Sequence, residues 1–523
     1  MNIAAVLQAN SAQHGGRIAL TACRKGVSSH GLEIEAARYA AKLREAGLKQ
    51  GDAVLVFYPM SVELYAALLA IFQLGLVAMF IDPAAGKEHL ERCCELHPPQ
   101  ALIASTKAHL LRLVAPALRR IPHKFVIGLP MLGAKLLNRH KAKSALSPDE
   151  KPDIVAVADS HPALITFTSG STGQPKAALR THGFLLAQHR VLQHSLGLTP
   201  GEIDLTTLPI FVLANLASGV HSVIPSADLR FPGAIDPKPI VRQIELMKPV
   251  STAASPALLE RVADYCLQQQ IQLTSFQKIF TGGAPVFPRL LDKLQAIAPQ
   301  AKIVAVYGST EAEPIAEIAR DEIMEADSQA MRNGRGLLVG KPVPEIELRI
   351  LCDQWGTPVA PLTSAEFAAA CVANNEPGEI VVSGEHVLPG YLHGQGDEET
   401  KFRVDEKIWH RTGDAGYLDV EGRLWLLGRC SAKIVDARGT LFPFAVECAA
   451  SHFPTVQRAA LVSLQGKRVL VLEWGSGNDG FLLQLRESLA WAKLDAVRVV
   501  DRIPVDKRHN AKVDYPALQQ MLS

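Results

Sequence analysis

Positions 163–176 read Ala163-Leu164-Ile165-Thr166-Phe167-Thr168-Ser169-Gly170-Ser171-Thr172-Gly173-Gln174-Pro175-Lys176. The apolar first part predicts a buried strand over 163–168. The six residues from Thr168 to Gly173 supply four hydroxyls and two glycines to a predicted loop, and Lys176 adds a positive charge. Because N–H and O–H donors on such a loop can converge on phosphate oxygens, the stretch predicts a phosphate-binding loop. A serine- and glycine-rich surface turn is the alternative reading of this stretch alone.

Strand-like and helical segments alternate on both sides of this stretch. Segments 302–307 and 379–383 read as strands, whereas 258–270 and 289–298 carry apolar residues at helical spacing. This alternation predicts an α/β fold, in an α+β multidomain arrangement. We expect a large N-terminal domain of layered sheets and helices over residues 1–428. A small, mobile C-terminal α+β domain over 429–523 follows it, with strands at 458–464, 468–473 and 497–500 and a helix at 481–493.

Composition excludes several classes of protein. The chain has 523 residues, 48% of them hydrophobic, and 54 Lys+Arg against 52 Asp+Glu. This near-neutral charge lacks the concentrated positive surface that is typical of nucleic-acid-binding proteins. The eight cysteines show no zinc-like spacing, so we expect a reduced, cytoplasmic protein. The most apolar stretch, 64–81, is short and broken for a transmembrane segment, and predicts a buried helix leading into a strand.

Three further segments carry groups suited to a nucleotide. Tyr307-Gly308-Ser309-Thr310-Glu311 ends a predicted strand, where ligands collect in open α/β sheets. Asp414 lies on a glycine-bounded loop, and its carboxylate suits the two hydroxyls of a ribose. A turn-capping role for Asp414 is equally compatible with the residues alone. Segment 504–512 holds many donors near the C-terminus, and reads as a solvated tail or a catalytic arm.

Together and in this order, the segments around Lys176, Glu311, Asp414, Arg429 and Lys512 resemble the adenylate-forming superfamily of acyl-CoA synthetases, luciferases and peptide-synthetase adenylation domains. The resemblance covers essentially the whole chain. It implies an enzyme that uses ATP and Mg²⁺ to activate a carboxylic acid as acyl-AMP, with release of pyrophosphate. It also implies that residues 1–428 bind ATP and the acyl group, and that 429–523 form a lid carrying the catalytic lysine.

The resemblance further implies roles for single residues. The phosphates would be held by Thr168, Ser169, Gly170, Ser171, Thr172, Gly173 and Lys176. The rest of the nucleotide would be bound by Gly283, Ala284, Pro285, Tyr307, Gly308, Asp414 and Arg429. The catalytic residues would be Lys512, which reaches the α-phosphate and the substrate carboxylate, Thr310, and Glu311, which is also the metal ligand.

The sequence departs from the common pattern at the predicted hinge. Ser431 stands where an Asp or Lys is usual, and the loop that follows is altered through Gly439, which weighs against CoA as second substrate. The variant runs 211–217, 439–443 and 504–512 are most similar to the β-lactone synthetases of olefin biosynthesis. That likeness implies a long-chain 2-alkyl-3-hydroxy acid that cyclises to a β-lactone with release of AMP. The alternative is a fatty acyl-CoA or acyl-carrier ligase.

Several questions stay open at this point. His182 is either a pocket base or a histidine packed behind the loop. The basic segment Lys135–Lys143, with Leu132, Leu136 and Leu137, is either a solvated linker face or a surface that touches a membrane or gates a lipid pocket. The expected partner is a small-molecule acyl substrate, not nucleic acid, and association with other pathway enzymes is left open. A non-catalytic nucleotide-binding scaffold is the rival of another class.

Overall fold

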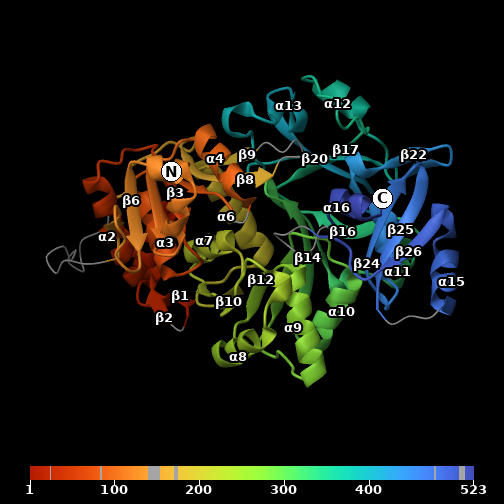
Figure 1. Cartoon of the computed structure of the whole chain (residues 1–523), viewed down its shortest axis with the longest axis horizontal. Coiled ribbons are helices and arrows are strands. Elements are labelled where there is room, and N and C mark those ends of the chain that lie inside the picture. The colour runs from red at the N-terminus through yellow and green to blue at the C-terminus, as the bar shows by residue number, and fades with distance from the viewer. Residues whose placement is uncertain are drawn as a thin grey trace. The chain divides into compact units, whose positions relative to one another are not determined.

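The structure is a computed structural model that describes residues 1–23, 25–82, 85–138, 153–169, 175–475, 479–505 and 513–522. The chain forms two compact units (Figure 1). The first comprises Met1–Ser226, Met247–Thr252 and Gly390–Gly396, and the second comprises Ala227–Leu246, Ala253–Pro389 and Asp397–Ser523. The boundary predicted between residues 428 and 429 falls inside the second unit and stays a prediction.

The first unit is built on a seven-stranded sheet in the order β7-β6-β5-β3-β4-β8-β9. All neighbours are parallel except β8 and β9, which form an antiparallel hairpin. The strands are β3 (Ala53–Phe57), β4 (Val77–Phe80), β5 (Ala101–Ser105), β6 (His123–Ile127), β7 (Lys135–Leu136), β8 (Pro162–Ser169) and β9 (Pro175–Thr181). The helices of this unit are α1 (Ile3–His14), α2 (Ser29–Glu45), α3 (Val62–Gln73), α4 (Lys87–Leu96), α5 (Pro116–Arg120), α6 (His182–Leu196) and α7 (Pro209–Ser218).

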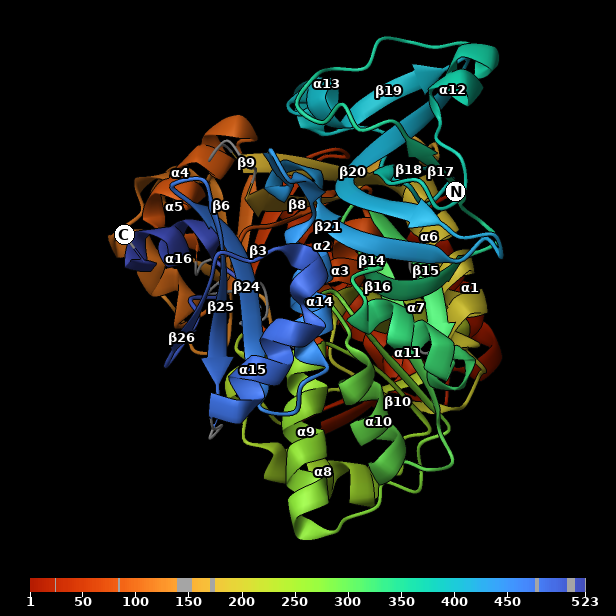
Figure 2. The same cartoon turned by 90° about the vertical axis from the view of Figure 1, so that its right-hand side faces the viewer.

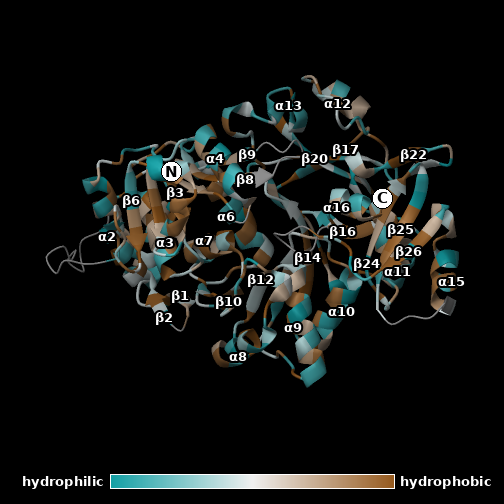
Figure 3. Cartoon of the chain, viewed as in Figure 1, coloured by the Kyte–Doolittle hydropathy of each residue, from teal (hydrophilic) through white to brown (hydrophobic). Residues whose placement is uncertain are grey.

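The most apolar stretch of the sequence forms helix α3 and then strand β4. Residues 64–73 are all buried, so the helix is apolar on every side, as its brown colour in Figure 3 shows. The Ser61 side chain accepts from the Leu64 N–H and caps the first turn. The predicted buried helix leading into a strand is therefore confirmed. Among the helices of the described residues, none has the length and apolarity that crossing a membrane requires.

A second group of strands completes the first unit. β10, β11 and β1 pair in parallel, and β2 adds antiparallel to β1. The bounds are β1 (Ile18–Ala22), β2 (Lys25–Ser28), β10 (Ile203–Thr206) and β11 (His221–Val223). Helix α7 is joined to β10 and β11 by Asn215, whose amide donates to Asp204 Oδ2 at 3.1 Å and to Ser222 Oγ at 2.9 Å. The chain passes from one unit to the other within helix α8 (Pro237–Met247) and again within strand β12 (Ser251–Ala254).

The second unit holds a larger sheet in the order β13-β14-β15-β16-β21-β20-β18-β17, with β19 on β20. Its strands are β13 (Lys278–Gly282), β14 (Lys302–Ser309), β15 (Ala312–Ala319), β16 (Leu337–Pro342), β17 (Glu347–Leu351), β18 (Gly378–Ser383), β19 (Lys401–Val404), β20 (Lys407–Leu418) and β21 (Leu424–Arg429). The helices around it are α9 (Pro256–Gln269), α10 (Pro288–Ile297), α11 (Glu325–Arg332), α12 (Ser364–Ala370) and α13 (Asp397–Thr400). The strands and helices predicted between 258 and 383 are all present.

The C-terminal part of this unit has a three-stranded sheet, β24-β25-β26, after a hairpin of β22 and β23 (Figure 2). One face of the sheet packs on α14 and α15 through Val446, Leu472 and Leu485, and the other packs on α16 through Leu518. The bounds are β22 (Ile434–Asp436), β23 (Gly439–Leu441), α14 (Pro443–Ser451), β24 (Val456–Leu464), β25 (Lys467–Trp474), α15 (Asp479–Ser488), β26 (Ala496–Val500) and α16 (Tyr515–Leu522).

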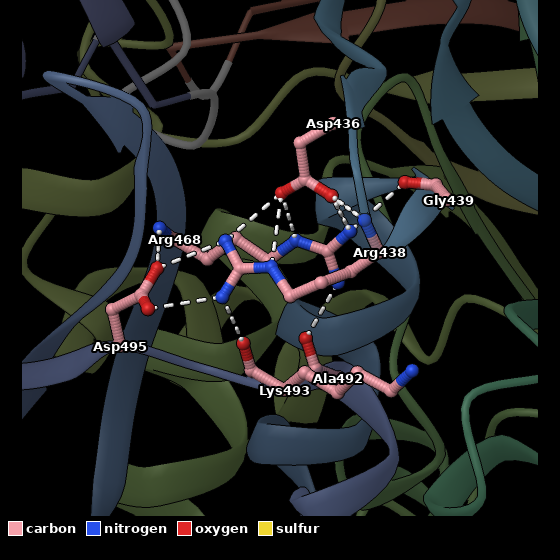
Figure 4. Close-up of polar contacts among 7 residues, drawn as sticks. All are labelled: Asp436, Arg438, Gly439, Arg468, Ala492, Lys493 and Asp495. Carbon is pink, nitrogen blue, oxygen red and sulfur yellow. Dashed lines mark hydrogen bonds and ion pairs between the residues drawn. The ribbon is translucent and has the colours of Figure 1, made fainter.

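The helix predicted over 481–493 ends earlier than expected, because α15 stops at Ser488 and a 3₁₀ turn follows at Ala490–Ala492. Two arginines bind the carbonyls of this turn: Arg468 Nη1 donates to Ala492 O at 2.9 Å, and Arg438 Nη1 donates to Lys493 O at 3.0 Å (Figure 4). Both arginines also pair with Asp436 in the β22–β23 hairpin. These contacts come from distant parts of the chain, so local helical spacing does not reveal them.

Candidate active site

The predicted phosphate loop joins the two strands of the β8–β9 hairpin. In the register of this hairpin Thr168 pairs with Lys176, and Ser169 pairs with Pro175. The loop therefore leaves the end of a strand, as the sequence predicts. The loop residues Gly170, Ser171, Thr172 and Gly173 lie outside the described residues.

The side chain of Lys176 is half-buried beside the segment Gly390–Gly396 of the same unit. Its Nζ lies 5.9 Å from the centroid of the Tyr391 ring, within the range of a cation–π contact. Gly396 has a φ of 98°, and a Cβ built there would lie 2.8 Å from Lys176 Nζ. Glycine at position 396 therefore leaves the space that this lysine occupies.

Three predicted nucleotide-binding residues contact one another in the second unit. The Tyr307 hydroxyl donates to Asp414 Oδ2 at 2.7 Å, and Arg429 Nε lies 3.3 Å from Asp414 Oδ1. The register of β20 on β21 places Asp414 opposite Arg429. Burial, followed by the nearby Asp414 carboxylate, raises the pKa of the Tyr307 phenol well above 10.0, which keeps it a donor. Each carboxylate oxygen has two lone pairs, so Asp414 retains capacity to accept from ribose hydroxyls.

The glycine stretch after β13 reaches the same edge of the sheet as Tyr307. β13 and β14 are parallel, with Gly282 opposite Val306, so their carboxyl ends lie side by side. A Cβ on Gly282 would lie 2.6 Å from the Val306 carbonyl oxygen, which explains the need for glycine there. Gly283, Ala284 and Pro285 continue from this end, where the family resemblance implies a nucleotide-binding segment.

Thr310 and Glu311 form the tight turn between β14 and β15. The Glu311 N–H donates to Ser309 Oγ at 3.2 Å, and the Glu311 carbonyl accepts from the Leu388 N–H at 2.7 Å. Its carboxylate interacts electrostatically with Lys401, His410 and Arg429. The predicted metal ligand therefore interacts with two positive groups, Lys401 and Arg429, and with the His410 ring.

Lys401 and His410 are buried groups that sequence reasoning did not single out. The Lys401 ammonium donates to the Leu388 carbonyl, and burial lowers its pKa to about 8. Burial, followed by the charge of Lys401, lowers the pKa of His410 to about 3, so its ring is neutral at pH 7. His410 lies four positions before Asp414 in the sequence, whereas nothing in the local sequence distinguishes Lys401 from a surface lysine.

A buried ion pair supports the strand that carries Asp414. Arg411 Nη2 lies 2.6 Å from Glu379 Oε2, and both side chains are almost completely buried. The Trp355 ring packs on the Arg411 guanidinium and on Gly413, where a Cβ would come within 2.9 Å of it. This pair joins β18 to β20 and fixes the backbone three residues before Asp414. Local sequence gives no signal for such a pair, because its members are 32 positions apart.

The catalytic lysine predicted at position 512 lies outside the described residues, but the chain on both sides of it is described. Val505 and Val513 form an antiparallel bridge, and the Asp514 N–H donates to Pro504 O at 2.9 Å. The Tyr515 hydroxyl donates to Glu447 Oε1 at 2.6 Å. The segment that contains Lys512 therefore begins and ends at one anchored base.

His182 begins helix α6 and is fully buried. Its Nδ1 accepts from the Ile3 N–H at 3.1 Å, and its ring stacks on His161 with 5.9 Å between centroids. Burial, followed by His161, lowers the pKa of His182 to about 4. Of the two alternatives left open by the sequence, the structure favours the packed histidine over a pocket base.

The described residues contain no group of three or more His, Cys, Asp or Glu side chains able to hold a metal ion by themselves. A single carboxylate such as Glu311 fits a magnesium ion that is held mainly by nucleotide phosphates. The donor set is thus compatible with a metal that arrives with ATP.

Comparison with known proteins agrees with this arrangement. The model of the family described as "AMP-binding enzyme" matches residues 7–392. An olefin β-lactone synthetase from Stenotrophomonas maltophilia is 31% identical over 506 residues, covering 92% of this chain and 88% of that protein. A feruloyl-CoA synthase from Amycolatopsis sp is 28% identical, covering 95% of this chain and 93% of that protein.

A solved structure shares the fold. The O-succinylbenzoate coenzyme A synthetase from Bacillus subtilis, in complex with AMP, has a TM-score of 0.76 at 21% identity, covering 99% of this chain and 98% of that one. The polar cluster at Asp414 and the β8–β9 hairpin thus occur in a chain that matches the AMP-binding enzyme family in sequence and an AMP-bound synthetase in fold. The chain belongs to the AMP-binding enzyme family and is an adenylate-forming ligase or synthetase.

Proposed function

We propose that this enzyme activates a long-chain 2-alkyl-3-hydroxy acid and closes it to a β-lactone, a reaction of olefin biosynthesis. The observation that carries the proposal is the 31% identity to an olefin β-lactone synthetase over 92% of this chain. The altered hinge supports it, because Ser431 stands where an Asp or Lys is usual, and this change weighs against CoA as the second substrate.

In the first half-reaction, a carboxylate oxygen of the acid attacks the α-phosphorus of ATP and pyrophosphate leaves. Both partners are anions, so positive groups must neutralise charge before they approach. The phosphate loop with Lys176 binds the β- and γ-phosphates, Tyr307 and the 283–285 segment line the adenine, and Asp414 with Arg429 holds the ribose. Thr310 binds phosphate, and Lys512 neutralises the α-phosphate and the attacking carboxylate. When bound at Glu311, Mg²⁺ supplies a further positive charge to the phosphates.

In the second half-reaction, the 3-hydroxyl oxygen of the same molecule attacks the activated carbonyl carbon. The bond to AMP breaks, AMP leaves with the electron pair, the hydroxyl proton is released, and a four-membered ring closes. The nucleophile is intramolecular, and well-oriented cases reach effective molarities of roughly 10⁵ M or more. No external acceptor is required.

A product assay tests the proposal. Purified enzyme with Mg·ATP and a racemic long-chain 2-alkyl-3-hydroxy acid should give AMP and a product lighter than the acid by one water, detected by mass spectrometry, with or without CoA. The matched control is the same 2-alkyl acid without the 3-hydroxyl, which should support pyrophosphate exchange but give no lactone.

The second candidate is a fatty acyl-CoA or acyl-carrier ligase, which the 28% identity to a feruloyl-CoA synthase favours. The same assay separates the two. A CoA thioester as the product, or turnover of plain fatty acids without turnover of hydroxy acids, would contradict lactone formation. Pyrophosphate exchange would be retained in either case.

A further inference from the structure

Exposed apolar side chains are concentrated in one stretch of the first unit. Of the sixteen large apolar side chains that are exposed among the described residues, five fall between positions 110 and 132, and Leu132 is 93% exposed. Single exposed leucines are ordinary, but a group of them marks an interaction site. We call this group the apolar face; its members are Leu110, Leu113, Val114, Leu129 and Leu132.

The two segments that form the apolar face are neighbours in the fold. The first three members follow β5 and the last two follow β6, and because these strands are adjacent and parallel, both segments leave the same edge of the sheet. Thr106 Oγ1 donates to the Leu129 carbonyl at 2.9 Å, and Arg112 Nη1 donates to the Leu132 carbonyl at 3.1 Å. The leucines are therefore presented together.

Buried polar contacts hold this face in place. The His109 ring is buried below the first segment, and its Nε2 lies 3.0 Å from the Phe125 carbonyl oxygen on β6. Lys42 Nζ donates to the Leu136 carbonyl at 3.1 Å and to the Leu137 carbonyl at 2.6 Å, which fixes the chain just beyond the second segment. The apolar side chains are thus exposed on segments that hydrogen bonds hold in place.

The stretch of chain that carries the apolar face is rich in positive charge. Residues 96–148 contain nine Lys and Arg and not one Asp or Glu, although the chain as a whole carries only +2. Two of these cations, Lys107 and Lys135, are exposed and lie three positions along the chain from Leu110 and Leu132. A second copy of the chain would bring like charges together, which is unfavourable. An anionic surface with an apolar interior complements both properties of the face.

We propose that the apolar face docks the enzyme onto a membrane surface that contains anionic lipids. The leucines enter the boundary between headgroups and acyl chains, while the neighbouring lysines, Lys107 and Lys135, meet the lipid phosphates. The protein lies on the bilayer in this arrangement and does not cross it. The proposal does not depend on which acid the enzyme activates.

Vesicle sedimentation tests this proposal with the whole chain. Wild type should co-sediment with vesicles of equal parts phosphatidylglycerol and phosphatidylcholine, and much less with pure phosphatidylcholine. Binding should fall in 1 M salt, where the Debye length is about 3 Å. The double variant Leu113→Ser with Leu132→Ser should bind ~10-fold more weakly or worse, because two leucines no longer leave water.

Leu246→Ser is the matched control, since Leu246 is an equally exposed leucine in α8 of the other unit. It should bind like wild type, and all variants should keep the wild-type rate of pyrophosphate exchange, which shows that they fold. No binding to anionic vesicles, equal binding to both lipid compositions, or an equal loss in the control overturns the proposal. The proposal is also overturned if the wild type is a dimer in solution and the double variant becomes a monomer without any loss of vesicle binding.

Discussion

At the scale of single residues, Asp414 is defined by its two neighbours. One carboxylate oxygen accepts from the Tyr307 phenol and the other faces the Arg429 guanidinium. The side chain is 17% exposed, so it is shielded but still accessible. Tyr307 and Arg429 hold the carboxylate in one orientation, which suits an acceptor for two adjacent hydroxyls.

Asp414→Asn replaces this acceptor with an amide of the same size. A hydrogen bond to a charged group is worth about 1.5–3 kcal/mol, so the KM for ATP in pyrophosphate exchange should rise by roughly 10- to 100-fold. Tyr307→Phe is the control, because it removes one partner of the carboxylate and keeps the charge. It should raise the KM less than Asp414→Asn does. An unchanged KM for the asparagine variant would rule out ribose binding by Asp414.

At the scale of elements, a buried carboxylate joins three elements of the C-terminal part. Glu447 lies on α14, and its Oε1 accepts from the Leu461 N–H of β24 at 2.9 Å and from the Tyr515 hydroxyl of α16 at 2.6 Å. Burial raises the pKa of Glu447 to about 7. The folded protein therefore binds a proton here at a pH where the unfolded chain, with a pKa of 4.5, does not.

The sign of the pH dependence follows from this difference. Below about pH 4.5 the Glu447 carboxyl is protonated in both states and does not lower the free energy of unfolding. As the pH rises to 7 it lowers the free energy of unfolding by up to about 3 kcal/mol, at 1.36 kcal/mol for each pKa unit. Glu447→Gln keeps an oxygen that accepts both hydrogen bonds but does not ionise. The thermal midpoint of the variant relative to wild type should therefore rise between pH 5 and pH 8. Glu398→Gln, at an exposed position, should show no such trend, and a flat difference for both variants would refute the shifted pKa.

Elements defined by local patterns could be predicted from the sequence, whereas contacts between distant residues could not. Short apolar runs identified the strands β8, β14 and β18, and helical apolar spacing identified α9, because burial leaves a signal in neighbouring positions of the sequence. The Glu379–Arg411 pair and the buried Lys401 leave no such signal, since the partners meet only in the folded sheet. The early end of α15 has the same origin in Arg438 and Arg468.

The candidate site shows the same division. The motif residues Tyr307, Asp414 and Arg429 were named from the sequence, and the structure brings these three together. Their mutual hydrogen bond and ion pair were not predicted, because a motif specifies residue types and order but not which groups contact each other. Sequence reasoning left His182 between two roles, and only its full burial against His161 favours one of them.

At the scale of the whole molecule, the proposed reaction divides its work among separate parts of the chain. Lys176 belongs to the first unit, Asp414 belongs to the second, and Lys512 stands in the sequence between Val505 and Val513, which form a bridge near the C-terminus. Nucleotide binding and chemistry can therefore be separated by mutation. Binding of ATP should depend on the cluster at Asp414. The attack of the carboxylate on the α-phosphorus should depend on Lys512.

Lys512→Ala tests this separation. Removing the proposed catalytic cation should slow pyrophosphate release by ~100-fold or more, while the thermal midpoint stays near that of wild type, because the role proposed for this lysine is in the reaction and not in folding. Saturating AMP should still stabilise the variant, by about 2.7 kcal/mol at a hundred times Kd. Lys507→Ala, five positions earlier in the same segment, is the matched control and should keep the wild-type rate. Normal pyrophosphate release by Lys512→Ala would exclude this lysine from adenylation, and loss of the AMP effect would move its role from chemistry to nucleotide binding.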